Sequence, residues 1–94
     1  MIIVAGSLRV AAADREAYLH AVHDVAVQAR RAPGCHDFVQ AADPADPERI
    51  VIYERWETDE DLAAYRGSGG EEPDTPDLLG ADVAKYRIAS VEAP

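Results

Sequence analysis

The segment from residue 33 to residue 65 constrains the fold more than any other part of the chain. It opens with Pro33 and Gly34, which end a preceding helix because proline cannot continue one and glycine accepts a left-handed turn. An apolar run then leads to Asp43-Pro44-Ala45-Asp46-Pro47, whose residue types favour a turn. Thr58 follows a second apolar run and can cap a helix. The segment therefore predicts strands over 35–42 and 49–56, joined by this turn, and then a helix.

The flanking residues complete a β-α-β-β-α-β order. Residues 2–10 are mostly apolar and rich in β-branched side chains, which favours a strand. Apolar residues at helical spacing predict a helix from Arg15 to Ala32, with Asp14 as its N-cap. The last strand is predicted over 83–91. This order predicts an α+β, ferredoxin-like fold with a four-stranded antiparallel sheet.

Length and charge narrow the class of protein. The 94 residues suit one domain over 1–94, with an acidic loop over 67–82 in which Leu78 and Leu79 return the chain to the body. A net charge of −9 repels phosphates, so nucleic acid is not expected as a partner. We find no apolar run long enough for a membrane span and no signal-peptide pattern. Cys35 is the single cysteine, and a cytoplasmic location is expected.

Several predicted strands are apolar on both faces. In the strand over 49–56, Val51 and Tyr53 point opposite to Ile50 and Ile52. With both helices on one side of the sheet, the other side would expose a large apolar surface. Two copies can bury these surfaces against each other in a two-fold contact, so we predict a homodimer through the sheet faces.

Specific residues resemble those of the antibiotic biosynthesis monooxygenase family. The resemblance covers residues 1–66 and is carried by the Pro-Gly-Cys sequence at 33–35, the turn at 43–47 and the sequence at 53–57 that leads into Glu60-Asp61-Leu62. It implies a ferredoxin-like fold that pairs into a dimeric α/β barrel, with a ligand cavity between sheet and helices in each subunit. It also implies oxygenation of anthrones or quinols without a cofactor, or haem degradation.

Departures from the family pattern separate these activities. Haem-degrading members carry an Asn on the first strand and a haem-ligating His after the second helix; here the first position is Gly6, and no His lies beyond His36. The resemblance therefore implies neither haem nor another cofactor. Polyketide-anthrone oxygenases have an Asn and a Tyr at the positions of Ile52 and Leu62, so only their Trp is kept, as Trp56. By position, Gly6 and Ile52 are expected to contribute to the substrate site.

Oxygenation without a cofactor needs a base that removes a proton from the substrate in a dry pocket. Glu54 is in phase with Ile52 and Trp56, so it is predicted to face the cavity as this base. A structural hydrogen bond or an ion pair is the alternative role. His23 lies on the flank of the first helix, where it is either a base at the cavity mouth or a half-exposed surface side chain.

Aromatic residues are candidates for holding a flat substrate. Trp56 and Tyr65 offer surfaces on which a ring can stack, although packing of the core explains them equally well. No metal site is predicted, because His20 and His23 diverge around the helix and have no third ligand nearby.

The sequence therefore predicts a cofactor-independent monooxygenase that acts on an aromatic, quinol or polyketide-like small molecule. Two alternatives remain open from the sequence. One is a ligand-binding or accessory dimer without catalytic activity, and the other is an isomerase or cyclase on the same scaffold.

Overall fold

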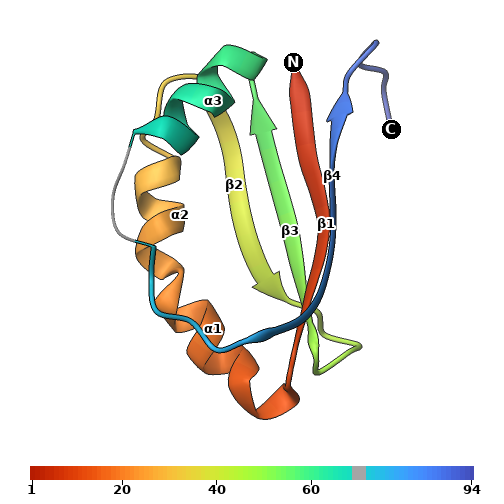
Figure 1. Cartoon of the computed structure of the whole chain (residues 1–94). Coiled ribbons are helices and arrows are strands. Elements are labelled where there is room, and N and C mark those ends of the chain that lie inside the picture. The colour runs from red at the N-terminus through yellow and green to blue at the C-terminus, as the bar shows by residue number, and fades with distance from the viewer. Residues whose placement is uncertain (69–71) are drawn as a thin grey trace.

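The computed structural model describes residues 1–68 and 72–94, and it has a four-stranded sheet with its helices packed on one face (Figure 1). The sheet order is β2-β3-β1-β4, and all neighbouring strands are antiparallel. The predicted ferredoxin-like α+β fold is therefore confirmed. The elements are β1 (Ile2–Val10), the 3-10 helix η1 (Ala12–Asp14), α1 (Arg15–Ala21), α2 (His23–Ala29), β2 (Cys35–Ala42), β3 (Arg49–Trp56), α3 (Asp59–Gly67) and β4 (Leu78–Arg87).

The core lies between the helices and the central strands. Along β3, every second side chain is buried, which is the period of a strand with one covered face. The buried residues form two clusters. Beneath α3 the cluster contains Ile2, Val4, Ala29, Phe38, Trp56 and Leu62, and toward the other end of the sheet it contains Val10, Tyr18, Val22, Ile50 and Ile52.

The predicted first helix is shorter than expected and is interrupted. Val22 has φ −95° and ψ 3°, which separates α1 from α2, and α2 ends at Ala29 rather than at Ala32. Pro33 disfavours helical geometry in the residue before it, and the chain tightens in that last turn, where the Ala32 N–H donates to the Ala29 carbonyl. Gly34 makes the predicted left-handed turn with φ +81°. Asp14 precedes α1 but makes no capping hydrogen bond through its side chain.

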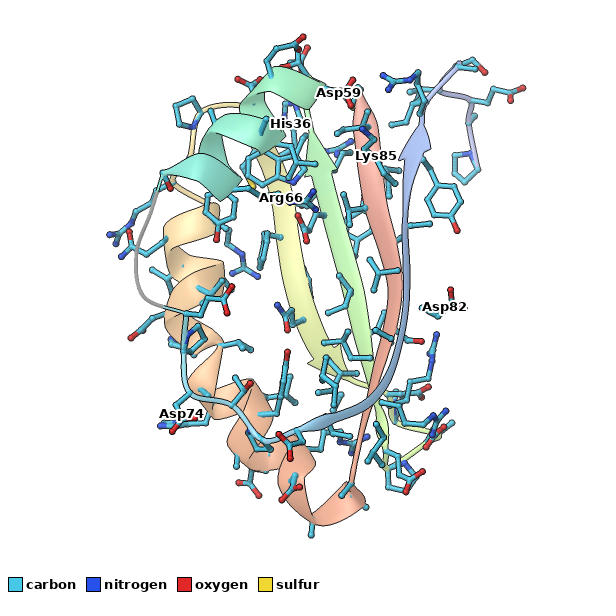
Figure 2. All side chains as sticks on the ribbon, viewed as in Figure 1. His36, Asp59, Arg66, Asp74, Asp82 and Lys85 are labelled. Carbon is cyan, nitrogen blue, oxygen red and sulfur yellow. The ribbon has the colours of Figure 1, made fainter. Side chains whose placement is uncertain are left out.

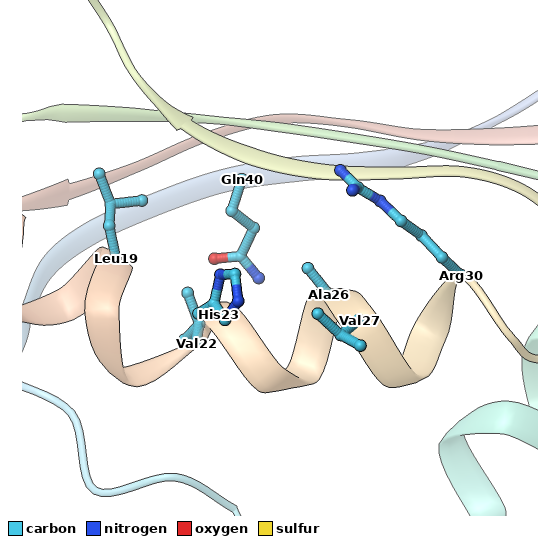
Figure 3. A pocket seen from close by; sticks show the side chains of 7 residues that line it. All are labelled: Leu19, Val22, His23, Ala26, Val27, Arg30 and Gln40. Atoms are coloured by element: carbon cyan, nitrogen blue, oxygen red, sulfur yellow. The ribbon is translucent and has the colours of Figure 1, made fainter.

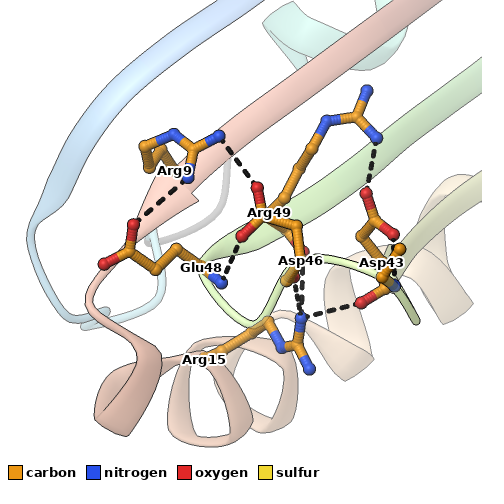
Figure 4. Close-up of polar contacts among 7 residues, drawn as sticks. Arg9, Arg15, Asp43, Asp46, Glu48 and Arg49 are labelled. Atoms are coloured by element: carbon orange, nitrogen blue, oxygen red, sulfur yellow. Dashed lines mark hydrogen bonds and ion pairs between the residues drawn. The ribbon is translucent and has the colours of Figure 1, made fainter.

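Two other local predictions are confirmed. Thr58 caps α3, because its hydroxyl accepts a hydrogen bond of 3.1 Å from the Asp61 N–H. In the turn between β2 and β3, the Asp43 carboxylate accepts from the Ala45 N–H, and Arg15 holds the turn by donating to the carbonyls of Asp43, Asp46 and Arg49 (Figure 4). Arg15 thereby fastens the start of α1 to the hairpin.

Strand β4 differs most from the sequence prediction. It runs over Leu78–Arg87 rather than 83–91, because it pairs with β1 along nearly its whole length. Leu78 and Leu79 belong to this strand and are 45% and 63% exposed, so they do not anchor the chain in the core. Residues 72–77 have no regular structure, in agreement with the predicted loop, whose residues 69–71 lie outside the described residues.

Side chains of β4 form ion pairs with the start of α3. Asp59 at the start of α3 pairs with Lys85 and Arg87, each at 2.7 Å (Figure 2). These partners hold the pKa of the Asp59 carboxyl well below its usual range. Among the described residues, no helix is long and apolar enough to cross a membrane.

The close approach of β4 to β1 yields a stability prediction. Gly6 has φ +151°, and a Cβ added there would lie 1.9 Å from the Asp82 carbonyl oxygen. Gly6→Ala should therefore lower the free energy of unfolding by about 2 kcal/mol, measured by urea denaturation. Gly80→Ala is the matched control in the same strand pair, since its nearest atom would be 4.0 Å away. Equal effects of the two substitutions would contradict the packing constraint at Gly6.

Candidate functional site

Glu54 is a carboxylate buried beneath the helices. It lies on β3 between Ile52 and Trp56, and only 9% of the residue is exposed. Its Oε1 accepts a hydrogen bond of 3.0 Å from the Trp56 indole N–H. Within the described residues it has no ion-pair partner, so its structural contact is this hydrogen bond rather than a pair with an Arg of the first helix.

The surroundings of Glu54 favour its protonated form. Burial raises the pKa of the Glu54 carboxyl, while the hydrogen bond from Trp56 and the positive charge of Arg66 act in the opposite direction. A carboxyl group with a raised pKa is a stronger base when it is ionised. Glu54 thus has the electrostatic property that a proton-abstracting group requires.

Aromatic rings lie beside this carboxylate. The Trp56 and Tyr65 ring centroids are 5.3 Å apart with planes tilted by 32°, and Phe38 meets Tyr65 edge-on at 6.1 Å. Burial, and then the charge of Glu54, raises the pKa of both the Tyr65 hydroxyl and the Cys35 thiol. The structure therefore brings together three of the residues singled out from the sequence, Glu54, Trp56 and Tyr65. It adds Cys35 and Phe38 to them, and we call this group the Glu54 cluster.

Gly6 and Ile52 lie side by side but apart from the aromatic rings. They are direct partners across β1 and β3. Ile52 packs in the second core cluster with Val22, away from the Glu54 cluster. The closeness of the β4 backbone explains on its own why position 6 holds a glycine. The part of Gly6 in substrate binding stays a prediction.

His23 lines a different hollow. A half-open cavity of about 150 Å³ lies between β2 and the helices α1 and α2, and Figure 3 shows the side chains of His23, Arg30 and Gln40 on its wall. The Gln40 Oε1 atom is buried and has no hydrogen-bond partner within the described chain. Glu54 does not line this cavity. The residues that line the cavity are Leu19, Val22, His23, Ala26, Val27, Arg30 and Gln40.

Gln40 and Arg30 were not predicted from the sequence. The signals that could have found them are the in-phase position of Gln40 with Phe38 on β2 and the seven-residue spacing of His23 and Arg30 on the helix. The other histidines contribute nothing to the Glu54 cluster: His36 pairs with Glu57 at 2.6 Å, and His20 is exposed on α1. Among the described residues, no group of three or more His, Cys, Asp or Glu is arranged to hold a metal ion.

The raised pKa of Glu54 predicts a particular dependence of stability on pH. The folded state binds this proton more tightly than the unfolded chain, so ionisation of Glu54 costs folding free energy. That cost is absent when the pH lies below the pKa of Glu54 in the unfolded chain. It grows as the pH rises toward the pKa of Glu54 in the folded protein. Glu54→Gln should therefore raise the free energy of unfolding at neutral pH and have less effect in acid, as measured by denaturation across this range.

Glu57→Gln is the control with the opposite sign. The hydrogen bond from His36 lowers the pKa of the exposed Glu57 carboxyl, so its contribution is present above the unfolded pKa and is lost as the pH falls. A Glu54→Gln variant that is less stable than the wild type at neutral pH would show that the ionised carboxylate stabilises the fold instead.

Comparisons with known proteins place the chain in a family. The family model described as antibiotic biosynthesis monooxygenase matches residues 1–70. A Nitrosomonas europaea protein assigned to these monooxygenases is 23% identical, with 96% of this chain and 100% of that chain covered and a TM-score of 0.72. One from Deinococcus radiodurans, also assigned to them, is 15% identical, with 100% and 98% covered and a TM-score of 0.77.

The heme-degrader MhuD from Mycobacterium tuberculosis, solved with two hemes bound in its active site, has a similar fold. It is 16% identical, with 99% of this chain and 100% of that chain covered and a TM-score of 0.72. At these identities the likeness of the solved structures shows a shared fold. No curated protein matched the sequence. Because the family model covers most of its length, this chain belongs to the antibiotic biosynthesis monooxygenase family.

Proposed function

We propose that this chain is a monooxygenase that needs no cofactor and oxidises a phenolic or quinol-like aromatic molecule, with Glu54 as the base. The family supports the reaction class, and the observation that carries the assignment is the buried Glu54 carboxylate without an ion pair in the described chain. A side chain with these properties is costly to bury, and a role in proton transfer accounts for its retention.

The proposed reaction uses the substrate as its own reductant. Glu54 removes a proton from an activated C–H or O–H group, and the resulting anion passes electrons to dioxygen. For a methylene group between aromatic rings, the carbon becomes a carbonyl with one oxygen atom, and the other oxygen atom leaves as water with the two hydrogens. The substrate supplies all the electrons that this balance requires.

The hydrogen bond from Trp56 defines how Glu54 would act. Because the indole N–H binds Oε1, the Oε2 atom is left to accept the substrate proton. Trp56 and Tyr65 offer ring surfaces beside the carboxylate on which the substrate anion can stack, and the Tyr65 hydroxyl can donate to a substrate oxygen. His23 is then a second candidate base, confined to the cavity next to β2.

A binding protein without catalysis is the second candidate function. It is favoured by one observation. The rings of Phe38, Trp56 and Tyr65 pack against one another beside Glu54, and the cavity near His23 does not include Glu54. Under this alternative, Glu54 is a buried hydrogen-bond acceptor that orients Trp56.

Oxygen uptake distinguishes the two functions. Incubation with anthrones and hydroquinones in air should consume dioxygen, and Glu54→Gln should reduce the rate about 100-fold, since the amide cannot take up the proton. Glu57→Gln, which changes an exposed carboxylate immediately after the end of β3, should retain the wild-type rate. Binding of these ligands without uptake would support the non-catalytic alternative, and product formation without uptake would indicate an isomerase or cyclase.

We also propose that two copies pair through the side of the sheet away from the helices, which we call the open face. Ile3, Ala5, Val51 and Tyr53 lie on this face because they alternate with buried residues of β1 and β3. At its borders, Val39 and Tyr86 are 36% and 57% exposed. An apolar face of this kind supports an interface between copies of the chain.

Charge placed on the open face should separate the copies. Tyr86→Glu should shift the molar mass measured by light scattering at micromolar concentration from two chains toward one, because a carboxylate would be buried at the interface. His20→Glu is the control, since it adds the same residue on the exposed surface of α1. A wild-type protein that scatters as a single chain at this concentration would contradict the pairing.

A further inference from the structure

We infer that the cavity between β2 and the helices α1 and α2 is a second small-molecule site, which binds a single-ring phenol that also carries a carboxylate. The site consists of Gln40 and Arg30 with the apolar side chains around them (Figure 3). It does not include Glu54, so the inference stands independently of the proposed oxygenation.

The size and walls of the cavity select a single ring. Its volume is about 150 Å³, and four of its lining residues, Leu19, Val22, Ala26 and Val27, are apolar. An apolar cavity of about this volume holds a benzene molecule. Two fused rings with substituents are larger and would protrude through the open side. The cavity therefore favours one aromatic ring over the polycyclic substrates considered for the Glu54 cluster.

Gln40 supplies a partner for a hydroxyl group on the ring. Its Oε1 is buried and unpaired within the described chain, and a buried polar atom without a partner destabilises the protein. Rotation of the amide about its last side-chain bond turns this oxygen into the cavity, where a phenolic hydroxyl that donates to it removes that penalty. The hydroxyl also fits the amide in its other orientation, because a phenol oxygen can accept from the amide N–H.

Arg30 supplies a partner for an anionic group. Its Nε donates to the Phe38 carbonyl at 2.9 Å, which holds the guanidinium against β2. The terminal nitrogens of that guanidinium can bind a carboxylate through two parallel hydrogen bonds. His23 and Arg30 are seven residues apart, so the cavity wall extends about 10 Å along the helix. This length accommodates a ring near Gln40 and His23 with its carboxylate toward Arg30.

Because the whole chain is acidic, binding of a ligand with a carboxylate depends on the contact with Arg30. With a net charge of −9, the protein repels anions at long range. Recognition of a carboxylate must therefore come from a local contact, and Arg30 is the cationic side chain among the residues that line the cavity.

The test is a calorimetric titration of the full chain with 4-hydroxybenzoate, followed in parallel by the side-chain amide signals of Gln40 in NMR spectra. Saturable binding with a shift of these signals is expected. Benzoate lacks the hydroxyl and phenol lacks the carboxylate, so each should bind about tenfold or more weakly. 6-Hydroxy-2-naphthoate, whose second ring would protrude from the cavity, should also bind about tenfold or more weakly. Equal affinity for all four compounds, or no saturation by 4-hydroxybenzoate at millimolar concentration, would overturn the inference.

Variants assign the two polar contacts separately. Arg30→Gln should weaken 4-hydroxybenzoate about tenfold and leave phenol unchanged, while Gln40→Leu should weaken 4-hydroxybenzoate by a similar factor and leave benzoate unchanged. The unchanged ligand in each case verifies that the cavity is still folded. Arg31→Gln, which removes the same charge from the neighbouring residue outside the cavity, should bind as the wild type does. A loss with Arg31→Gln as large as with Arg30→Gln would mean that only overall charge matters, and would reject the site.

Discussion

The alternation of buried and partly exposed side chains along β3 determines where the proposed base, Glu54, lies. Ile50, Ile52 and Trp56 are buried beneath the helices, and burial of such side chains stabilises a fold by about 1.5–3 kcal/mol each. Glu54 shares their face, so the apolar residues on either side bring it into the interior despite the cost of desolvating a carboxylate. Among the described residues, the hydrogen bond to its carboxylate comes from Trp56, which belongs to the same set. The proposed base thus occupies its position because its neighbours in the strand must be buried.

Local signals in the sequence were sufficient for the fold and for part of the site. The turn at 43–47 and the cap at Thr58 depend on contacts between residues close in sequence, and both are present in the structure. The burial of Glu54 and its position beside Trp56 followed from strand alternation. These features require no knowledge of how distant segments pack.

Features that depend on distant segments were not predicted. The start of β4 at Leu78 is determined by its pairing with β1, and no local residue type marks it. The break at Val22 and the cavity beside it depend on how the helix packs against β2. Gln40 became a candidate binding residue only once the structure placed it on the cavity wall, since a glutamine on a strand usually faces water. The helix α2 borders both regions: its Ala29 packs in the core cluster that contains Phe38 and Trp56, and its Ala26 and Val27 line the cavity near Gln40.

The exposure of β4 bears on how the protein avoids aggregation. An edge strand offers unpaired backbone groups to which a strand of another molecule can add. Here the edge carries charge toward both sides of the sheet: Asp82 lies opposite Ser7 and projects away from the helices, while Lys85 and Arg87 point to the helical side (Figure 2). A foreign strand that adds to β4 would have to accommodate these charges on both of its own faces. This edge strand is thereby protected from indiscriminate strand addition.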